Sequence, residues 1–302
     1  MPFTVIFDDG TNCGHAHRLA EQAQGCCSRK GGKEIQEIES RADLKKTDPA
    51  PIKEKKTAAK KFSVEKRFDI LKTISGMVCR GSQRSIFVAG NGGTGKTFTI
   101  FDEIEKHGLT KEEVTITSDD DNVVTSDSDA YIKVSGASSP LGLYRVLYEN
   151  SDSLIVFDDC DGFLNNDNAV NILKAVLDTS GDGTVSWRSP IVERMGLPDS
   201  FQFRGRAIFI SNKEINKIPQ PILSRSLILD ITLDNREICE RARMLGDKLL
   251  PALSLDQRAA LFDFVEEHAN EFRDVSLRTF VLAAPYIAEG RTDWKDLVLF
   301  TS

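Results

Sequence analysis

The sequence contains no long uninterrupted run of apolar residues. None of its stretches approaches the roughly 18 consecutive apolar residues that suggest a transmembrane helix. Asp8 and Asp9 lie within the first ten residues, where a secretory signal would carry basic side chains. We therefore expect a soluble protein that stays in the cytoplasm and has no membrane partner.

An excess of positive charge is also missing. The chain has 39 Lys and Arg against 46 Asp and Glu, which gives a formal net charge of −7. Any contact with nucleic acid must therefore be local, because the protein as a whole does not attract a polyanion. Cysteine is scarce too, with six residues scattered through 302, and a chain of this length can build a core without disulfides. We interpret the cysteines as reduced thiols.

The first 61 residues differ from the rest of the chain. The segment Ser28–Lys61 carries eleven basic and six acidic residues but few large apolar ones. Such a composition buries too little apolar surface to offset the entropy of ordering, so it predicts a mobile basic arm that could tether a partner such as DNA. Five side chains that could bind zinc precede this arm: Cys13, His15, His17, Cys26 and Cys27. Their spacing is not that of a familiar zinc finger, and the alternative to a metal site is that they pack as small apolar residues or are disordered.

From Phe62 onward, short apolar runs alternate with helical patterns. This alternation predicts an α/β fold, with a five-stranded parallel sheet covered by helices on both faces. After Asp234 the strand patterns stop, which predicts a small all-helical domain. The expected regions are an N-terminal segment (1–61), an α/β core (62–234) and a helical lid (235–302). The five expected strands are 85–89, 131–135, 154–157, 207–210 and 227–231.

A glycine-rich segment lies between the first of these strands and a helix. It fits the pattern G-x-x-x-x-G-K-[ST], in which backbone N–H groups cradle phosphates, the lysine neutralises the β- and γ-phosphates and the hydroxyl contacts Mg²⁺. The pattern predicts nucleotide binding, against the alternative of a plain glycine turn. The candidate nucleotide-binding residues are Gly90, Asn91, Gly92, Gly93, Thr94, Gly95, Lys96, Thr97 and Phe98.

The third expected strand ends in two carboxylates, Asp158 and Asp159. Negative charge beside bound phosphate is costly unless a cation lies between them. We therefore expect Asp158, together with Thr97, to hold Mg²⁺, and Asp159 to orient or deprotonate the attacking water. The alternative is a turn at the end of a strand.

With this spacing, the phosphate loop and the acidic strand end resemble those of the AAA+ ATPases, a family of ring-forming P-loop enzymes. The resemblance extends from Phe62 to the end of the chain. It implies a polar sensor at the tip of the next strand, which Asn212 matches. An asparagine in an ordinary turn is the alternative.

The resemblance also implies two catalytic arginines. Arg225, in the segment Pro219–Ser226, matches an arginine finger that reaches the site of a neighbouring subunit, and a surface arginine is the alternative. Arg278 matches a second sensor in the lid, and an ordinary salt-bridged arginine is the alternative. A finger acting on a neighbour implies a homo-oligomer, either a ring or a partial ring.

Three features depart from the family pattern. Asp159 stands where most members have the longer Glu, so hydrolysis could be slow. The loop 136–139 lacks the aromatic, aliphatic and glycine triplet with which many members grip protein substrates. The extra segment 183–205 has the alternation of a β-hairpin, in which Trp187, Arg188 and Arg204 could contact DNA. The alternative is that the aromatic residues of this segment pack on the domain.

The resulting hypothesis is an AAA+ ATPase that uses ATP and Mg²⁺ at subunit interfaces to remodel a DNA or protein partner. Its compact core resembles small virus-encoded members of the family, which would place it in the host cytoplasm. The alternative is a nucleotide-regulated binding module with little turnover. A GTPase is disfavoured because Ile215 stands where the guanine motif that begins at Asn212 needs an Asp.

Overall fold

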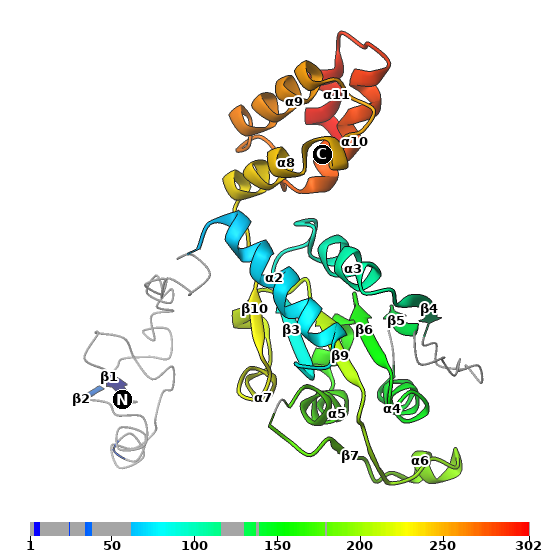
Figure 1. Cartoon of the computed structure of the whole chain (residues 1–302). Helices are drawn as coiled ribbons and strands as arrows, with labels where there is room; N and C mark the ends of the chain where they lie inside the picture. Colours follow the sequence, from blue (N-terminus) through cyan, green and yellow to red (C-terminus); the bar gives the residue numbers. More distant parts are fainter. Residues whose placement is uncertain are drawn as a thin grey trace. The chain divides into compact units, whose positions relative to one another are not determined.

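The computed structural model describes residues 3–6, 24, 34–37, 62–115, 130–136, 139–178 and 180–301. The chain divides into two compact units, Met1–Thr57 and Ala58–Ser302 (Figure 1). In the first unit, β1 (Phe3–Ile6) pairs antiparallel with β2 (Glu34–Glu37). Part of the predicted basic arm is therefore paired in a strand. The five possible zinc ligands lie outside the described residues.

The second unit is built on a six-stranded parallel sheet, with the strand order β10-β3-β9-β6-β5-β4. Five strands match the predicted ones to within one residue at each end. The prediction of five strands was nevertheless wrong, because β4 adds a sixth at the edge. The strands are β3 (Ser85–Ala89), β4 (Thr110–Thr115), β5 (Ala130–Ser135), β6 (Leu154–Asp158), β9 (Arg206–Ile210) and β10 (Ile228–Asp230).

Helices cover both faces of this sheet, as predicted (Figure 1). Successive side chains of a strand point to opposite faces, so Ile86 and Val88 join one apolar cluster while Phe87 and Ala89 join the other. The first cluster includes α2 (Val64–Cys79) and α3 (Lys96–Lys106), and the second includes α4 (Pro140–Glu149) and α5 (Asp167–Leu177). Shorter elements complete the core: η3 (Asp161–Asn165), η4 (Ile215–Lys217) and α7 (Gln220–Leu223).

The predicted hairpin is present as β7 (Thr184–Ser186) and β8 (Ser200–Gln202), which pair antiparallel around α6 (Pro190–Arg194). Its aromatic side chains favour packing over DNA contact. The Trp187 ring lies edge-on against Tyr144, with 5.7 Å between ring centroids, and Phe203 is fully buried. Trp187 is partly buried and packs on the domain, as the alternative interpretation expected, and DNA contact by this segment stays a prediction.

The exposed arginines of this segment have acidic neighbours. Arg188 lies 3.5 Å from Asp199, and Arg204 lies 3.4 Å from Asp152. All four side chains are more than half exposed, so these ion pairs add little stability.

Four helices follow the core, and the first begins directly after Asp234. They are α8 (Asn235–Leu249), α9 (Leu255–Glu267), α10 (Leu277–Ala288) and α11 (Trp294–Thr301). Their apolar faces share one cluster with α2, α3 and the sheet face beneath them. Among the described residues, no helix combines the length and apolar character needed to cross a bilayer.

Asp234 closes the N-terminus of α8 with a capping box. Its carboxylate accepts a hydrogen bond from the Glu237 N–H, and the Glu237 side chain accepts one from the Asp234 N–H. We expect Asp234→Ala to lower the free energy of unfolding by about 1 kcal/mol, because the Glu237 N–H loses the carboxylate that accepts its hydrogen bond. Urea denaturation would measure the loss, and Asp234→Ser should retain most of the stability. Equal stability of the Ala and Ser variants would contradict this role for the cap.

Candidate functional site

The glycine-rich loop lies at the carboxyl edge of the sheet, between β3 and α3. Gly90 and Gly93 have φ angles of +141° and +68°, which side-chain-bearing residues rarely adopt. A Cβ atom on Gly90 would lie 2.6 Å from the carbonyl carbon of Ile231, and one on Gly93 would lie 2.6 Å from Cβ of Ser276. Glycine is therefore required at these positions both by conformation and by the closeness of the surrounding chain.

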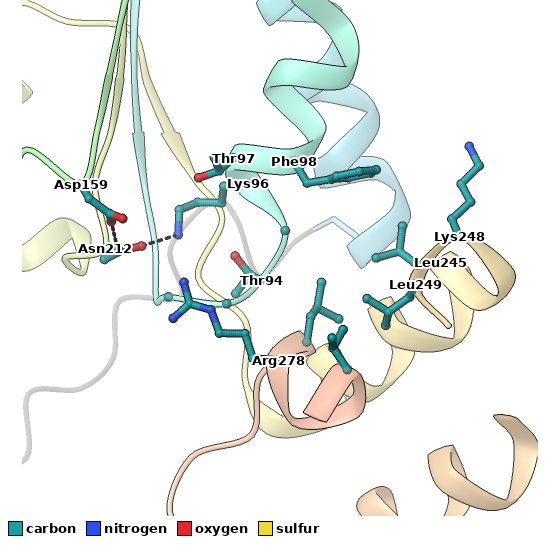
Figure 2. A pocket seen from close by; sticks show the side chains of 15 residues that line it. Thr94, Lys96, Thr97, Phe98, Asp159, Asn212, Leu245, Lys248, Leu249 and Arg278 are labelled. Carbon is teal, nitrogen blue, oxygen red and sulfur yellow. Dashed lines mark hydrogen bonds between the residues drawn. The ribbon is translucent and has the colours of Figure 1, made fainter. Parts of the chain in front are cut away.

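Lys96 is the first residue of α3, and its side chain folds back into the loop. Its Nζ donates hydrogen bonds to the carbonyl oxygens of Gly90 (2.8 Å) and Asn91 (2.7 Å), and it lies 3.4 Å from Oδ1 of Asn212 (Figure 2). The residue is 3% exposed, and this burial lowers the pKa of Lys96 to about 8, with three nearby aspartates opposing the shift. The ammonium group thus lies where an anion bound to the loop would meet it.

The Asn91 side chain has a different role from the rest of the loop. Its amide donates to the carbonyl oxygen of Leu233 and accepts from the Leu233 N–H, at 2.9 Å in both cases. It ties the loop to the chain that leads into α8. Together with Gly90, it is absent from the lining of the cavity described below.

Asp158, the last residue of β6, lies beside the loop and is 6% exposed. Burial raises the pKa of Asp158, while the hydrogen bond that Thr97 Oγ1 donates to its Oδ1 (3.0 Å) acts in the opposite direction. Its other oxygen lies 3.7 Å from Nζ of Lys133 on β5. Sequence analysis missed Lys133, although a lysine between Ile132 and Val134 in an apolar strand is a detectable anomaly.

Asn212, after β9, connects two further carboxylates. Its side-chain amide donates to Oδ1 of Asp159 (2.5 Å; Figure 2). Its backbone N–H donates to Oδ2 of Asp161 (3.1 Å). Asp159 has a φ angle of +57°, and among the described residues no other non-glycine residue has a positive φ. Such strained backbone is concentrated at functional sites. Asp161 was missed by sequence analysis, although its position two residues after Asp159 could have indicated it.

A cavity of about 350 Å³ lies between the loop and the lid helices, a size suited to a small ligand. One side of it is polar, and Figure 2 shows Arg278 on the same side as Lys96 and Asn212. The other side is largely apolar and includes lid residues that sequence analysis did not single out, because their helical spacing looks like ordinary core packing. Figure 2 shows Phe98, Leu245, Lys248 and Leu249 on this side, and Leu277 and Val281 also line the cavity.

Arg225 lies apart from this cavity. It follows α7, is exposed, and is absent from the residues that line the cavity. Its neighbourhood is a separate polar depression that also includes Gln83 and Asp178. The structure therefore gathers Lys96, Thr97, Asp158, Asp159, Asn212 and Arg278 around one edge of the sheet and leaves Arg225 on the surface.

Comparison with known proteins identifies one phage relative. No protein family model matches the sequence. The chain is 27% identical over 256 residues to an uncharacterized 36.7 kDa protein in the nrdC–mobD intergenic region of enterobacteria phage T4, which covers 78% of this chain and 74% of that protein. Among solved structures, a mutant of Thermotoga maritima RuvB has a TM-score of 0.35 at 13% identity. That match covers 67% of this chain but only 62% of the RuvB chain, so the chain spans less than two thirds of its length. At this TM-score the likeness carries no argument about the site.

Proposed function

We propose that this protein is a P-loop ATPase of the AAA+ type. In this proposal it binds ATP and Mg²⁺, hydrolyses ATP at the interfaces of a homo-oligomer, and remodels a DNA or protein partner. The main support is the buried Lys96 ammonium, held by the carbonyls of a glycine loop directly beside the Thr97 and Asp158 pair. The loop also opens at the carboxyl edge of a parallel sheet, which is where α/β proteins bind their ligands.

The polar side of the cavity fits a triphosphate. Loop N–H groups and the N-terminus of α3 favour negative charge, and Lys96 adds a full positive charge. On the apolar side, Phe98, Leu245 and Leu249 offer a surface for a base. The cavity is therefore matched in chemistry to a nucleotide with its phosphates at the loop.

The residues beside the loop also fit a magnesium ion. Mg²⁺ prefers oxygen ligands and retains several waters, and Thr97 Oγ1 and Asp158 Oδ1 lie only 3.0 Å apart. These two oxygens would hold the ion directly or through water. When bound, the ion would supply positive charge between the phosphates and the carboxylates.

Hydrolysis adds water to the terminal phosphate, giving ADP and inorganic phosphate. We assign Asp159 to orient the water and accept its proton, and Asn212 to fix Asp159 and contact the phosphate. Arg278 would contact the phosphates from the lid. Arg225 would act on the site of the adjoining subunit, since it does not line the cavity of its own chain.

A nucleotide-regulated switch with little turnover is the second candidate. It is favoured by Asp159, whose side chain is shorter than glutamate and is already engaged by Asn212. A catalytic group misplaced by about 1 Å can lose on the order of a hundredfold in rate. Both candidates share the same nucleotide site and differ only in whether ATP is consumed.

Steady-state phosphate release with saturating Mg-ATP separates these proposals. An ATPase predicts turnover well above that of a Lys96→Ala control, and the assay repeated with single-stranded and duplex DNA would show whether DNA stimulates it. Turnover equal to the control, with a fluorescent ATP analogue still bound, would favour the switch. Failure of the native chain to bind the analogue would overturn both.

The pH dependence of binding should follow Lys96. Only the protonated amine attracts phosphate, and the pKa of Lys96 in the free protein is about 8. Affinity for Mg-ATP is therefore expected to be constant below about pH 7. Above pH 8, where the amine loses its proton, each further pH unit should lower the affinity by up to about tenfold. Lys96→Arg should bind more weakly but with a flat profile from pH 7 to 9, because a guanidinium does not titrate there. Equal slopes for the two proteins would refute this assignment.

A further inference from the structure

Arg241, on the lid helix α8, is a buried charge that the proposed reaction does not use. It is 6% exposed, and its guanidinium stacks on Phe68, with 3.6 Å between the guanidinium carbon and the ring centroid. Among the described residues no carboxylate lies within 4.0 Å of it, and its buried Nε has no hydrogen-bond partner. Burial lowers the pKa of Arg241 to about 10, so the group stays charged at neutral pH. Burying a charge in this way is costly, which calls for a compensating role.

The hydrogen bond of Arg241 leads to the phosphate loop. Its Nη2 donates to Oγ1 of Thr99 (3.2 Å), a residue of α3 that is 2% exposed. The Thr99 hydroxyl in turn donates to the carbonyl oxygen of Gly95 (2.8 Å), which also accepts from the Thr99 N–H (3.0 Å). Because the hydroxyl donates its one proton to the Gly95 carbonyl, it accepts the hydrogen bond from Arg241 with a lone pair. A continuous chain therefore runs from the lid to the last glycine of the loop.

A second lid helix contacts the same loop. At the start of α10, the Leu277 N–H donates to the carbonyl oxygen of Gly93 (2.8 Å). A Cβ atom on Gly95 would lie 3.0 Å from Cδ1 of Leu277, so the loop and this helix are in close contact. The loop is thus fixed by α10 at Gly93 and by α8, through Thr99, at Gly95.

We propose that Arg241 is a positioning residue that couples the lid to the phosphate loop. By holding Thr99, it fixes the Gly95 carbonyl, and with it the direction of the loop N–H groups that would receive the phosphates of a nucleoside triphosphate. Coupling is reciprocal, so a phosphate that orders the loop also favours the lid position in which Arg241 reaches Thr99. The inference rests on the proposed nucleotide site, but its structural part concerns the loop alone.

Two substitutions interrupt the hydrogen-bond chain from Arg241 to Gly95 at different points. Arg241→Met keeps an unbranched apolar stem against Phe68 and removes the donor, whereas Thr99→Val keeps the side-chain shape and removes the hydroxyl. Arg243→Met is the matched control, because Arg243 lies on the same helix and loses the same charge but is bonded to Asp263 and Glu266 on the surface. Arg241→Lys tests whether a shorter cationic donor restores the function.

The first measurement is hydrogen–deuterium exchange of the nucleotide-free proteins, followed by mass spectrometry of peptides that cover residues 90–99. Arg241→Met and Thr99→Val should exchange at least about threefold faster in these peptides than the native chain, while Arg243→Met should not. The melting temperature of each variant identifies any variant that is unfolded. If Arg241→Met is unfolded, Thr99→Val still tests the hydrogen-bond chain. Unchanged loop exchange in folded variants would overturn the proposal, whatever the protein binds.

The second measurement is the Kd of a fluorescent ATP analogue with Mg²⁺. Each single variant should raise Kd about tenfold, the double variant should raise it no further, and Arg241→Lys should recover part of the loss. Additive effects of the two substitutions would show that they act separately and would overturn the coupling. Faster loop exchange without nucleotide binding by the native chain would instead retain the structural link and reject the proposed function.

Discussion

Replacing Arg225 with alanine is expected to lower the rate of ATP hydrolysis by about 10³-fold or more while leaving ATP affinity unchanged. The side chain is exposed and does not line the cavity of its own chain, so it has no contact there to lose. In a neighbouring subunit's site, its planar cation would stabilise charge that develops in the transition state. Two quantities are measured for each protein: kcat at saturating Mg-ATP, and the Kd of a fluorescent ATP analogue. Arg194→Ala is the control, since Arg194 is also an exposed arginine of the core and does not line the cavity.

Mixing two inactive proteins tests whether Arg225 acts between subunits. Arg225→Ala subunits retain Lys96, whereas Lys96→Ala subunits retain Arg225. If each site needs Lys96 from one subunit and Arg225 from the next, the mixture should regain activity at the interfaces that combine the two intact residues. No recovery in a mixture shown to co-assemble would mean that each site is self-contained. Arg225 would then be a surface residue whose role is confined to its own neighbourhood with Asp178.

Four of the five predicted strands lie inside the sheet, and the fifth, β10, is an edge strand that still carries an apolar run. β3 and β6 are covered on both faces, so every residue in them is buried and the apolar runs are unmistakable. β4 lies at the edge with a single neighbouring strand, and its sequence, TKEEVT, alternates too weakly for an apolar run to mark it. An edge strand without an apolar run is therefore the part of this fold that the sequence pattern does not reveal.

The candidate site divides in a similar way. The loop and Asp158 could be predicted because local sequence sets their geometry, as a strand, a glycine turn and the start of a helix. Lys133 could not be placed, since its proximity to Asp158 depends on which strands are neighbours in the sheet. The hydrogen bond between Arg241 and Thr99 could not be predicted either, because it joins residues 142 positions apart. Contacts between elements distant in sequence have no local signal.

Asp159→Asn is expected to lower kcat by about 10²- to 10⁴-fold. Asparagine tolerates a positive φ as well as aspartate does, and its side-chain oxygen can still accept the hydrogen bond from Asn212. The substitution therefore retains the local geometry and removes the group that would take the proton from water. Single-turnover hydrolysis with Mg-ATP in excess over its Kd would measure the chemical step, and Kd itself should change by less than about threefold, because the water lies beyond the bound phosphates.

Asp161→Asn is the matched control for this second prediction. It makes the same change two residues away, and its side-chain oxygen can still accept the bond from the Asn212 N–H. If Asp159 is the base, the Asp161 variant should retain most of the activity. A larger loss at Asp161 than at Asp159 would transfer the role to Asp161, since both carboxylates contact Asn212. Unchanged single-turnover rates in both variants would mean that neither is the base.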